Sequence, residues 1–136
     1  MIEYIWLDAN EGLRSKLKIN KGELVKEISQ CDIWNFDGSS TGQSEGKYSD
    51  VFLVPIRLYD DPFRKNHAKL VLCECYEDLK GTEPNEFNDR KPLADLQDKF
   101  KNEESLCGIE QEYVIYDLKT NLPVGWKTHK EPGCGP

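Results

Sequence analysis

The chain has 136 residues, which is enough for one ordinary domain with its own core and short for a multi-domain enzyme. Its 18 basic and 25 acidic residues give a net charge of −7 at pH 7, and no basic patch stands out along the sequence. This balance argues against a nucleic-acid partner, and the longest apolar runs are strand-sized, far below the roughly 20 residues that span a bilayer.

The first predicted elements form a β-hairpin. Residues 2–8 are rich in β-branched and aromatic side chains, residues 9–12 form a turn, and residues 13–19 alternate between two kinds of side chain. One face of this second strand carries Leu13, Ser15, Leu17 and Ile19. We expect that face to lie on the core and the alternating basic face, Arg14, Lys16 and Lys18, to lie in water.

A short, weakly amphipathic segment over residues 23–30 predicts one or two helical turns before a strand over 32–36. The loop that follows, residues 37–43, places one carboxylate, Asp37, where the strand ends. Gly38 and Gly42 allow backbone conformations that residues with a Cβ resist, and three hydroxyl side chains lie between them. Two interpretations stay open: a surface turn closed by its own Asp and Ser side chains, or a loop that presents acceptors to a small ligand.

Residues 50–59 form a long apolar run in which Pro55 cannot donate to a strand ladder, so we expect an edge or a bulge there. Residues 60–64 end this run, residues 69–76 are the best-defined strand, and residues 77–86 form a connection. Five strands with at most one short helix predict a small mixed sheet.

The five cysteines are odd in number and widely spread, and the first residues do not resemble a secretory signal, so we expect reduced thiols and a cytoplasmic protein. Cys73 and Cys75 could form half of a zinc site. Alternatively, they lie on one face of a strand as small buried side chains. With only His67 and His129 as further nitrogen ligands, the buried interpretation is the stronger one.

Within residues 88–102, Leu93, Leu96 and Phe100 recur at helical spacing, with Pro92 near the first turn, which predicts an amphipathic helix. A strand is predicted over residues 109–116, followed by a turn over 117–123. The tail over residues 125–136 is rich in glycine and proline and promises no regular structure.

Glu110 and Glu112 are two residues apart on the predicted strand, so both carboxylates leave the same face. Such a pair would suit a hard divalent cation, Mg²⁺ or Mn²⁺. The alternative is an ordinary solvated strand face. Against that alternative, Val114 and Tyr116 continue the same face with bulky groups, which predicts burial.

Several segments together resemble the glutamine synthetase family, in its eukaryotic (type II) branch. The matching segments, in the family's order, are residues 4–8, 11–16, 34–43, 49–55, 61–64, 70–74 and 108–113. The resemblance implies an α+β fold: a β-grasp-like domain of about five mixed strands over residues 1–86, then an amphipathic helix and the first strand of a truncated catalytic domain over residues 87–136.

The family's reaction joins ammonium to the γ-carboxylate of glutamate, with ATP as substrate and γ-glutamyl phosphate as intermediate, in homo-oligomeric rings with active sites between subunits. By analogy, Asp37 binds ammonium and takes its proton, Ser40 lies beside it, and Glu110 and Glu112 hold the Mg²⁺ or Mn²⁺ ions.

Because the family continues well beyond this length, we expect the N-terminal third of a glutamine synthetase, truncated in nature or made as a fragment, that is insufficient for catalysis alone. The alternative is a non-catalytic β-grasp module that associates with a full-length enzyme or modulates it.

Overall fold

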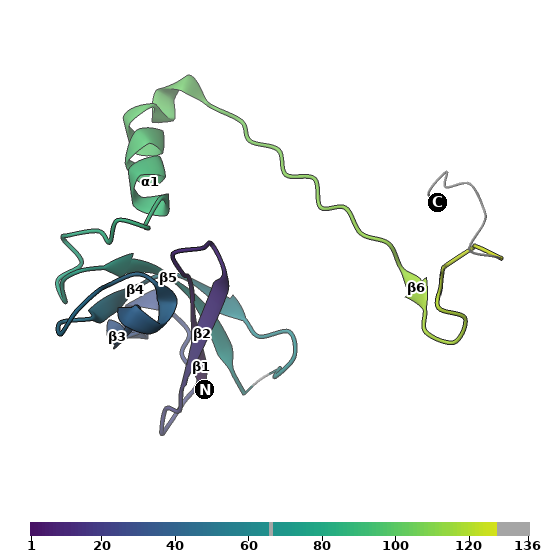
Figure 1. The fold of residues 1–136 in the computed structure, drawn as a ribbon, viewed down its shortest axis with the longest axis horizontal. Helices are drawn as coiled ribbons and strands as arrows, with labels where there is room; N and C mark the ends of the chain where they lie inside the picture. The colour runs from purple at the N-terminus through teal and green to yellow at the C-terminus, as the bar shows by residue number, and fades with distance from the viewer. Residues whose placement is uncertain (66, 128–136) are drawn as a thin grey trace. The chain divides into compact units, whose positions relative to one another are not determined.

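The computed structural model describes residues 1–65 and 67–127, and one mixed sheet dominates it (Figure 1). The sheet contains β1 (Ile2–Leu7), β2 (Leu13–Lys18), β3 (Trp34–Asp37), β4 (Asp50–Asp60) and β5 (Lys69–Tyr76). Its strand order is β2-β1-β5-β4-β3; β1 and β5 run parallel, whereas all other neighbours are antiparallel. The predicted hairpin and the predicted five-stranded mixed sheet are confirmed.

The remaining elements are short. They are the 3₁₀ turns η1 (Ile28–Gln30), η2 (Gly38–Thr41) and η3 (Lys101–Glu103), the helix α1 (Arg90–Lys99), and the two-residue strands β6 (Tyr116–Asp117) and β7 (Leu122–Pro123). The chain's contacts divide it into one unit over residues 1–102 and another from residue 103 onward. The predicted domain boundary between residues 86 and 87 stays a prediction. Among the described residues, no helix is both long and apolar enough to cross a membrane.

The core lies on one side of the sheet, where alternate residues of the central strands point inward. Tyr4, Val51, Leu53 and Val71 are completely buried, and Trp6 stacks at a tilt on the Phe36 ring with 4.5 Å between centroids. Burying a side chain of this size contributes about 1.5–3 kcal/mol. The core therefore joins strands that lie far apart in sequence, as an α+β fold requires.

Cys73 and Cys75 belong to this core, so their predicted burial is confirmed. Burial raises the pKa of the Cys75 thiol to about 11 and raises that of Cys73 further. Both side chains are thus neutral thiols at pH 7, and they behave as small apolar groups rather than as nucleophiles.

The predicted faces of β2 are wrong, because its basic side chains point to the inner side of the sheet. Lys16 Nζ donates to the backbone oxygen of Asn35 at 2.8 Å and lies 3.9 Å from the centroid of the Trp34 ring. Lys18 Nζ donates to Asp32 Oδ2 at 2.5 Å. Lys16 thus joins β2 to β3, the other edge of the sheet, and Lys18 joins β2 to the residues just before β3, which shows that the sheet is curled.

The alternating apolar face of β2 is consequently exposed. Leu13 and Ile19 are each 75% exposed, and Leu17 is 43% exposed. Alternation shows that a strand has two unlike faces, but it does not show which face is inside. In this sheet, lysine stems are long enough to cross the curl and carry their ammonium groups to polar partners at the far edge.

Pro55 lies beyond the part of β4 that pairs with β3, which ends at Leu53, so it has a neighbouring strand on the β5 side only. The expected local edge and the expected bulge are both confirmed. β4 lies between β5 and β3, and its register against β5 shifts between Pro55 and Arg57. Pro55 itself stands opposite Cys73, and Ile56 is the residue that the β5 register skips; this bulge lets the long strand bend. Of the one or two helical turns predicted over residues 23–30, one forms, the 3₁₀ turn η1.

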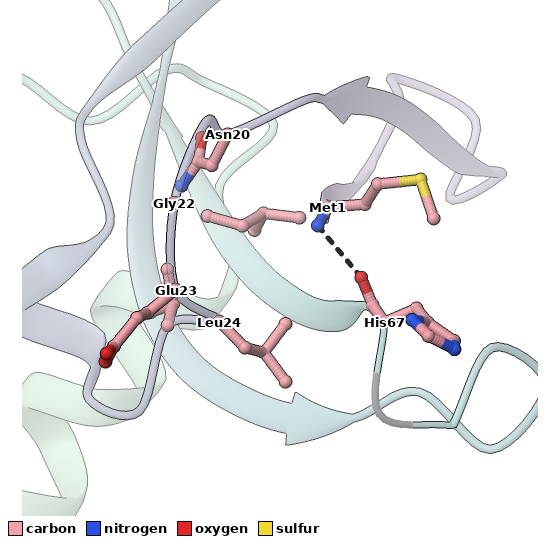
Figure 2. Close-up of a pocket in the computed structure, with 8 residues that line it drawn as sticks. Met1, Asn20, Gly22, Glu23, Leu24 and His67 are labelled. Carbon is pink, nitrogen blue, oxygen red and sulfur yellow. Dashed lines mark hydrogen bonds between the residues drawn. The ribbon is translucent and has the colours of Figure 1, made fainter.

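The beginning of the chain is joined to the start of β5. Figure 2 shows the α-amino group of Met1 directed at the backbone oxygen of His67, to which it donates at 2.9 Å. The amide of Lys69 donates in turn to the Met1 oxygen at 3.0 Å. A small hollow of about 170 Å³ lies beside these bonds. The bonds explain why β1 pairs with β5 from its first residue.

The helix is confirmed, as α1, but it does not bury its apolar side. Leu93, Leu96 and Phe100 are between 45% and 55% exposed. The strand predicted over residues 109–116 is wrong: residues 104–115 form no ladder, and only Tyr116–Asp117 pairs, with Leu122–Pro123. A strand needs a neighbour for its backbone groups, and the described part of this second unit supplies two residues of one.

Candidate functional site

The candidate site begins where β3 delivers Asp37 to the surface. β3 is an edge strand that pairs with β4, and Asp37 lies opposite Asp50 at its end. The backbone then turns into η2, and Asp37 caps this turn with its side chain. Its Oδ1 accepts hydrogen bonds from the Ser39 amide at 3.0 Å and from the Ser39 hydroxyl at 2.6 Å. The carboxylate is exposed and held in one orientation.

Hydrogen bonds lower the pKa of Asp37. The largest effect comes from the Ser39 hydroxyl, followed by the Ser49 hydroxyl and the Ser39 amide, since each donor stabilises the charged form. Asp37 is therefore a carboxylate at neutral pH. It can attract a cation, and it is a weak proton acceptor as long as it stays in water.

Ser40 and Thr41 bond the loop to itself. The Ser40 hydroxyl donates to the backbone oxygen of Asp37 at 2.8 Å, and the Thr41 hydroxyl donates to that of Gly38 at 3.1 Å. Ser40 is exposed and bonds to the backbone of Asp37, whereas the hydroxyl that contacts the carboxylate is that of Ser39. Both interpretations of the loop are thus compatible with its geometry: it is closed by its own side chains, and it presents a carboxylate next to hydroxyls.

Glycine suits the two loop positions, 38 and 42, for different structural reasons. A Cβ on Gly38 would lie 2.5 Å from Val51 Cγ2 and 2.9 Å from Ser44 Cβ, so there is no room for a side chain. Gly42 has φ 72°, in the left-handed region that favours glycine. Gly38 lets the loop pack onto β4, and Gly42 reverses the chain after η2.

Three contacts from outside the loop hold it in place. The Ala9 amide donates to the Thr41 oxygen at 3.2 Å, and the Gln43 side chain donates to the Leu7 oxygen at 3.1 Å. Asn85, 42 residues further along, donates from Nδ2 to the Gln43 oxygen at 2.8 Å. The loop is thus positioned by the β1–β2 turn and by the connection after β5.

Sequence reasoning missed these positioning roles of Gln43 and Asn85. Both are only 3% exposed. A buried amide side chain needs partners, so its burial marks a structural role. The sequence carried no signal of that burial, because glutamine and asparagine in polar stretches are usually exposed.

The two predicted metal ligands belong to the second unit of the chain, from residue 103 onward. Glu110 and Glu112 are exposed and lie in the segment without regular structure, and Val114 and Tyr116, predicted to be buried, are exposed as well. Among residues 1–65 and 67–127, no three His, Cys, Asp or Glu residues cluster as a metal site would require. The two carboxylates have the chemistry that Mg²⁺ prefers, but they are only part of a ligand set.

Comparison with known proteins supports the resemblance. Residues 1–78 match the family model for the β-grasp domain of glutamine synthetase. The chain is 42% identical over 135 residues to a glutamine synthetase of Tuber borchii, and 44% identical over 133 residues to one of Schizosaccharomyces pombe; each alignment covers 98% of this chain. It is also 44% identical over 124 residues, 91% of the chain, to a glutamine synthetase of Saccharomyces cerevisiae.

The match is unequal in length. The chain spans 36% of the Tuber borchii and Schizosaccharomyces pombe proteins and 32% of the Saccharomyces cerevisiae protein. The similarity therefore covers nearly all of this sequence and about a third of each relative.

Proposed function

Since the chain belongs to the glutamine synthetase family, we propose that it supplies the ammonium-side loop of an ATP-dependent ligation of ammonium to glutamate and does not complete that reaction alone. The observation that carries the proposal is the Asp37 loop: an exposed, ionised carboxylate held in one orientation at the end of an edge strand.

Asp37 has two roles in this proposal. Its charged carboxylate attracts the ammonium cation, and the Ser39 donors fix the direction from which the cation approaches. Proton transfer is a second step that needs a stronger base. When a neighbouring subunit covers the loop, loss of water raises the pKa of the carboxyl, and Asp37 can then accept a proton from ammonium, which leaves ammonia as the nucleophile. Ser40, whose hydroxyl bonds to the Asp37 backbone, is the second loop residue that we propose for this site.

Glu110 and Glu112 would hold Mg²⁺ or Mn²⁺, whose chemistry is to neutralise phosphate charge and orient the transferred phosphoryl group of γ-glutamyl phosphate formation. In the described residues both carboxylates are exposed and without regular backbone structure. They therefore need the rest of a catalytic sheet to fix their spacing. Because phosphoryl transfer depends on positioned charges, a chain without that sheet is expected to be inactive.

Fragment complementation tests the proposal. The chain is mixed with the part of the Schizosaccharomyces pombe enzyme that lies beyond the aligned region, and ATP-dependent glutamine formation is measured. We expect turnover only in the mixture, and we expect Asp37→Asn to abolish it. Asp60→Asn, the same charge change at an exposed residue of β4, is the matched control and should leave turnover intact. Turnover by the chain alone, or an active mixture with Asp37→Asn, would contradict the proposal.

A non-catalytic module that associates with a full-length enzyme is the second candidate. It is favoured by the complete five-stranded sheet of the first unit and by the lack of a strand ladder over residues 104–115 of the second. Light scattering and pull-down with the full-length Schizosaccharomyces pombe enzyme distinguish the two functions. Stable association without any rescue of turnover supports the module, and a monomer that captures no enzyme excludes it.

A further inference from the structure

A second hollow lies on the outer face of the sheet, and none of its described lining residues belongs to the Asp37 loop. Its volume is about 500 Å³, within the usual range for small-ligand sites. It is formed by the end of β1, the middle of β5 and the connection that leads into α1. The side chains that decide its chemistry are Leu7, Asp8, Leu72, Glu74, Phe87 and Arg90.

Three of these side chains make the hollow apolar on one side. Leu7 is 48% exposed, Phe87 is 37% exposed, and Leu72 is partly buried. Their uncovered surface is in water in this structure. A ligand with an apolar body would remove that surface from water, which is favourable.

Four of the described carboxylate residues line the hollow: Glu11 and Asp89 are exposed, and Asp8 and Glu74 are buried. The two buried carboxylates are not equivalent. Both oxygens of Asp8 already have close donors, because Oδ1 accepts from the amides of Asn10 and Gly12 and Oδ2 accepts from Arg14 Nε at 2.7 Å. Glu74 is only 8% exposed, and its Oε2 accepts from the Tyr76 hydroxyl at 2.9 Å. Within the described part of the chain, no hydrogen bond reaches its Oε1, which lies 3.5 Å from Arg90 Nε.

The Glu74–Arg90 ion pair can be broken by movement of the Arg90 side chain alone. Its 3.5 Å separation exceeds the 2.7–2.9 Å of a good charge-assisted hydrogen bond. Arg90 is about half exposed at the first residue of α1 and can turn into water, whereas Glu74 is fixed on the central strand of the sheet. A cation entering the hollow can therefore replace Arg90, and the buried carboxylate gains the close partner that it lacks.

We propose that this hollow is a binding site for an organic cation, a primary amine or a guanidinium on an apolar body, whose charged group bonds to Glu74 Oε1 while its body covers Leu7, Leu72 and Phe87. The source of the cation is either a free small molecule or a basic side chain on another protein. The chemistry is the same in both cases.

Backbone amide NMR of the whole 136-residue chain tests the site with n-butylamine and n-butylguanidinium as probes. Saturable shifts are expected at residues 72–75 and 87–90. Butyrate, which has the same body and the opposite charge, should produce none. Saturation by butyrate instead of the cations would assign the site to Arg90 and overturn the proposal, as would the absence of any saturable shift.

Two variants with opposite expected effects separate the roles of the charges. Glu74→Gln keeps the shape of the side chain and should weaken cation binding about tenfold or more. Arg90→Gln removes the competitor and should tighten it about threefold. Asp60→Asn is the matched charge control on the same sheet and should change nothing. Weaker binding in Arg90→Gln, or unchanged binding in a folded Glu74→Gln variant, would contradict the proposal.

Circular dichroism shows whether each variant folds. If Glu74→Gln does not fold, Arg90→Gln still decides the test, because it removes only a half-exposed side chain. The capped tripeptide Leu-Arg-Leu, compared with Leu-Gln-Leu, distinguishes the sources. Tighter binding of Leu-Arg-Leu than of n-butylguanidinium assigns the site to a protein partner, and the reverse assigns it to a small molecule.

Discussion

Gly38→Ala should destabilise the chain because the new methyl group has no space. The added Cβ would lie 2.5 Å from Val51 Cγ2, 2.9 Å from Ser44 Cβ and 3.1 Å from the backbone oxygen of Ser49. Val51 is completely buried, so it cannot move away into water. The Gly38 amide also donates to Ser49 at 2.6 Å, and any shift of the loop away from β4 stretches this bond.

The expected decrease in the free energy of unfolding follows from the cost of overpacking a core, about 1–3 kcal/mol for one extra methyl group. We expect about 2 kcal/mol, because a backbone oxygen and a buried valine both resist the shift. A small domain loses roughly 1–3 kcal/mol of stability per molar urea, so the unfolding midpoint should fall by about 1 M. The melting temperature should fall by about 10 °C.

Urea unfolding followed by tryptophan fluorescence measures this change, since Trp6 is buried in the core and Trp34 packs against it. Gly108→Ala is the matched control, because nothing lies within 4 Å of its added Cβ and its φ is not in the left-handed region. The control should keep the parent midpoint within about 0.2 M. A Gly38→Ala midpoint as close to the parent value would refute the steric reasoning for the loop.

Three further outcomes are expected. Ser39→Ala removes the hydroxyl that contributes most to lowering the pKa of Asp37, so carbon-detected NMR titration should show this pKa rising towards its usual range. An unchanged pKa would contradict the hydrogen bonds described above. The pKa of Asp61 is lowered in the folded state, chiefly because its carboxylate accepts a hydrogen bond from the Arg64 amide. The stability that Asp61 contributes is therefore complete above its unfolded-state pKa and is lost as pH falls through its folded-state pKa. Urea unfolding between pH 5 and pH 2 should therefore show that the free energy of unfolding falls less steeply with pH in Asp61→Asn than in the parent. Equal pH dependence in the two proteins would exclude this contribution of Asp61. In hydrogen exchange, the amides of residues 104–115 should exchange at nearly intrinsic rates while those of 69–76 are protected at least about a thousandfold; protection of both would reveal a partner for the first segment.

The local sequence pattern was sufficient for the strands of the five-stranded sheet and for the position of the site loop. Runs of β-branched, aromatic and other apolar residues predicted β1 and β5, and the change from aromatic to small polar residues after β3 placed Asp37 at a strand end, where the structure has it. These are local properties, since backbone alternation and glycine's freedom act over a few residues. The buried thiols of β5 followed from the same alternation.

Three features depended on the tertiary structure. The inward face of β2 was decided by the curl of the sheet, which brings Lys16 to the far edge at Asn35. The Asp37 loop is held by Asn85, 42 residues beyond Gln43, and no local pattern connects the two. Residues 109–116 have the composition of a strand, yet a strand forms only against a neighbour, and the described residues do not provide one. Sequence alone determined which residues can form strands; the partners available in space decided which faces are buried and which strands form.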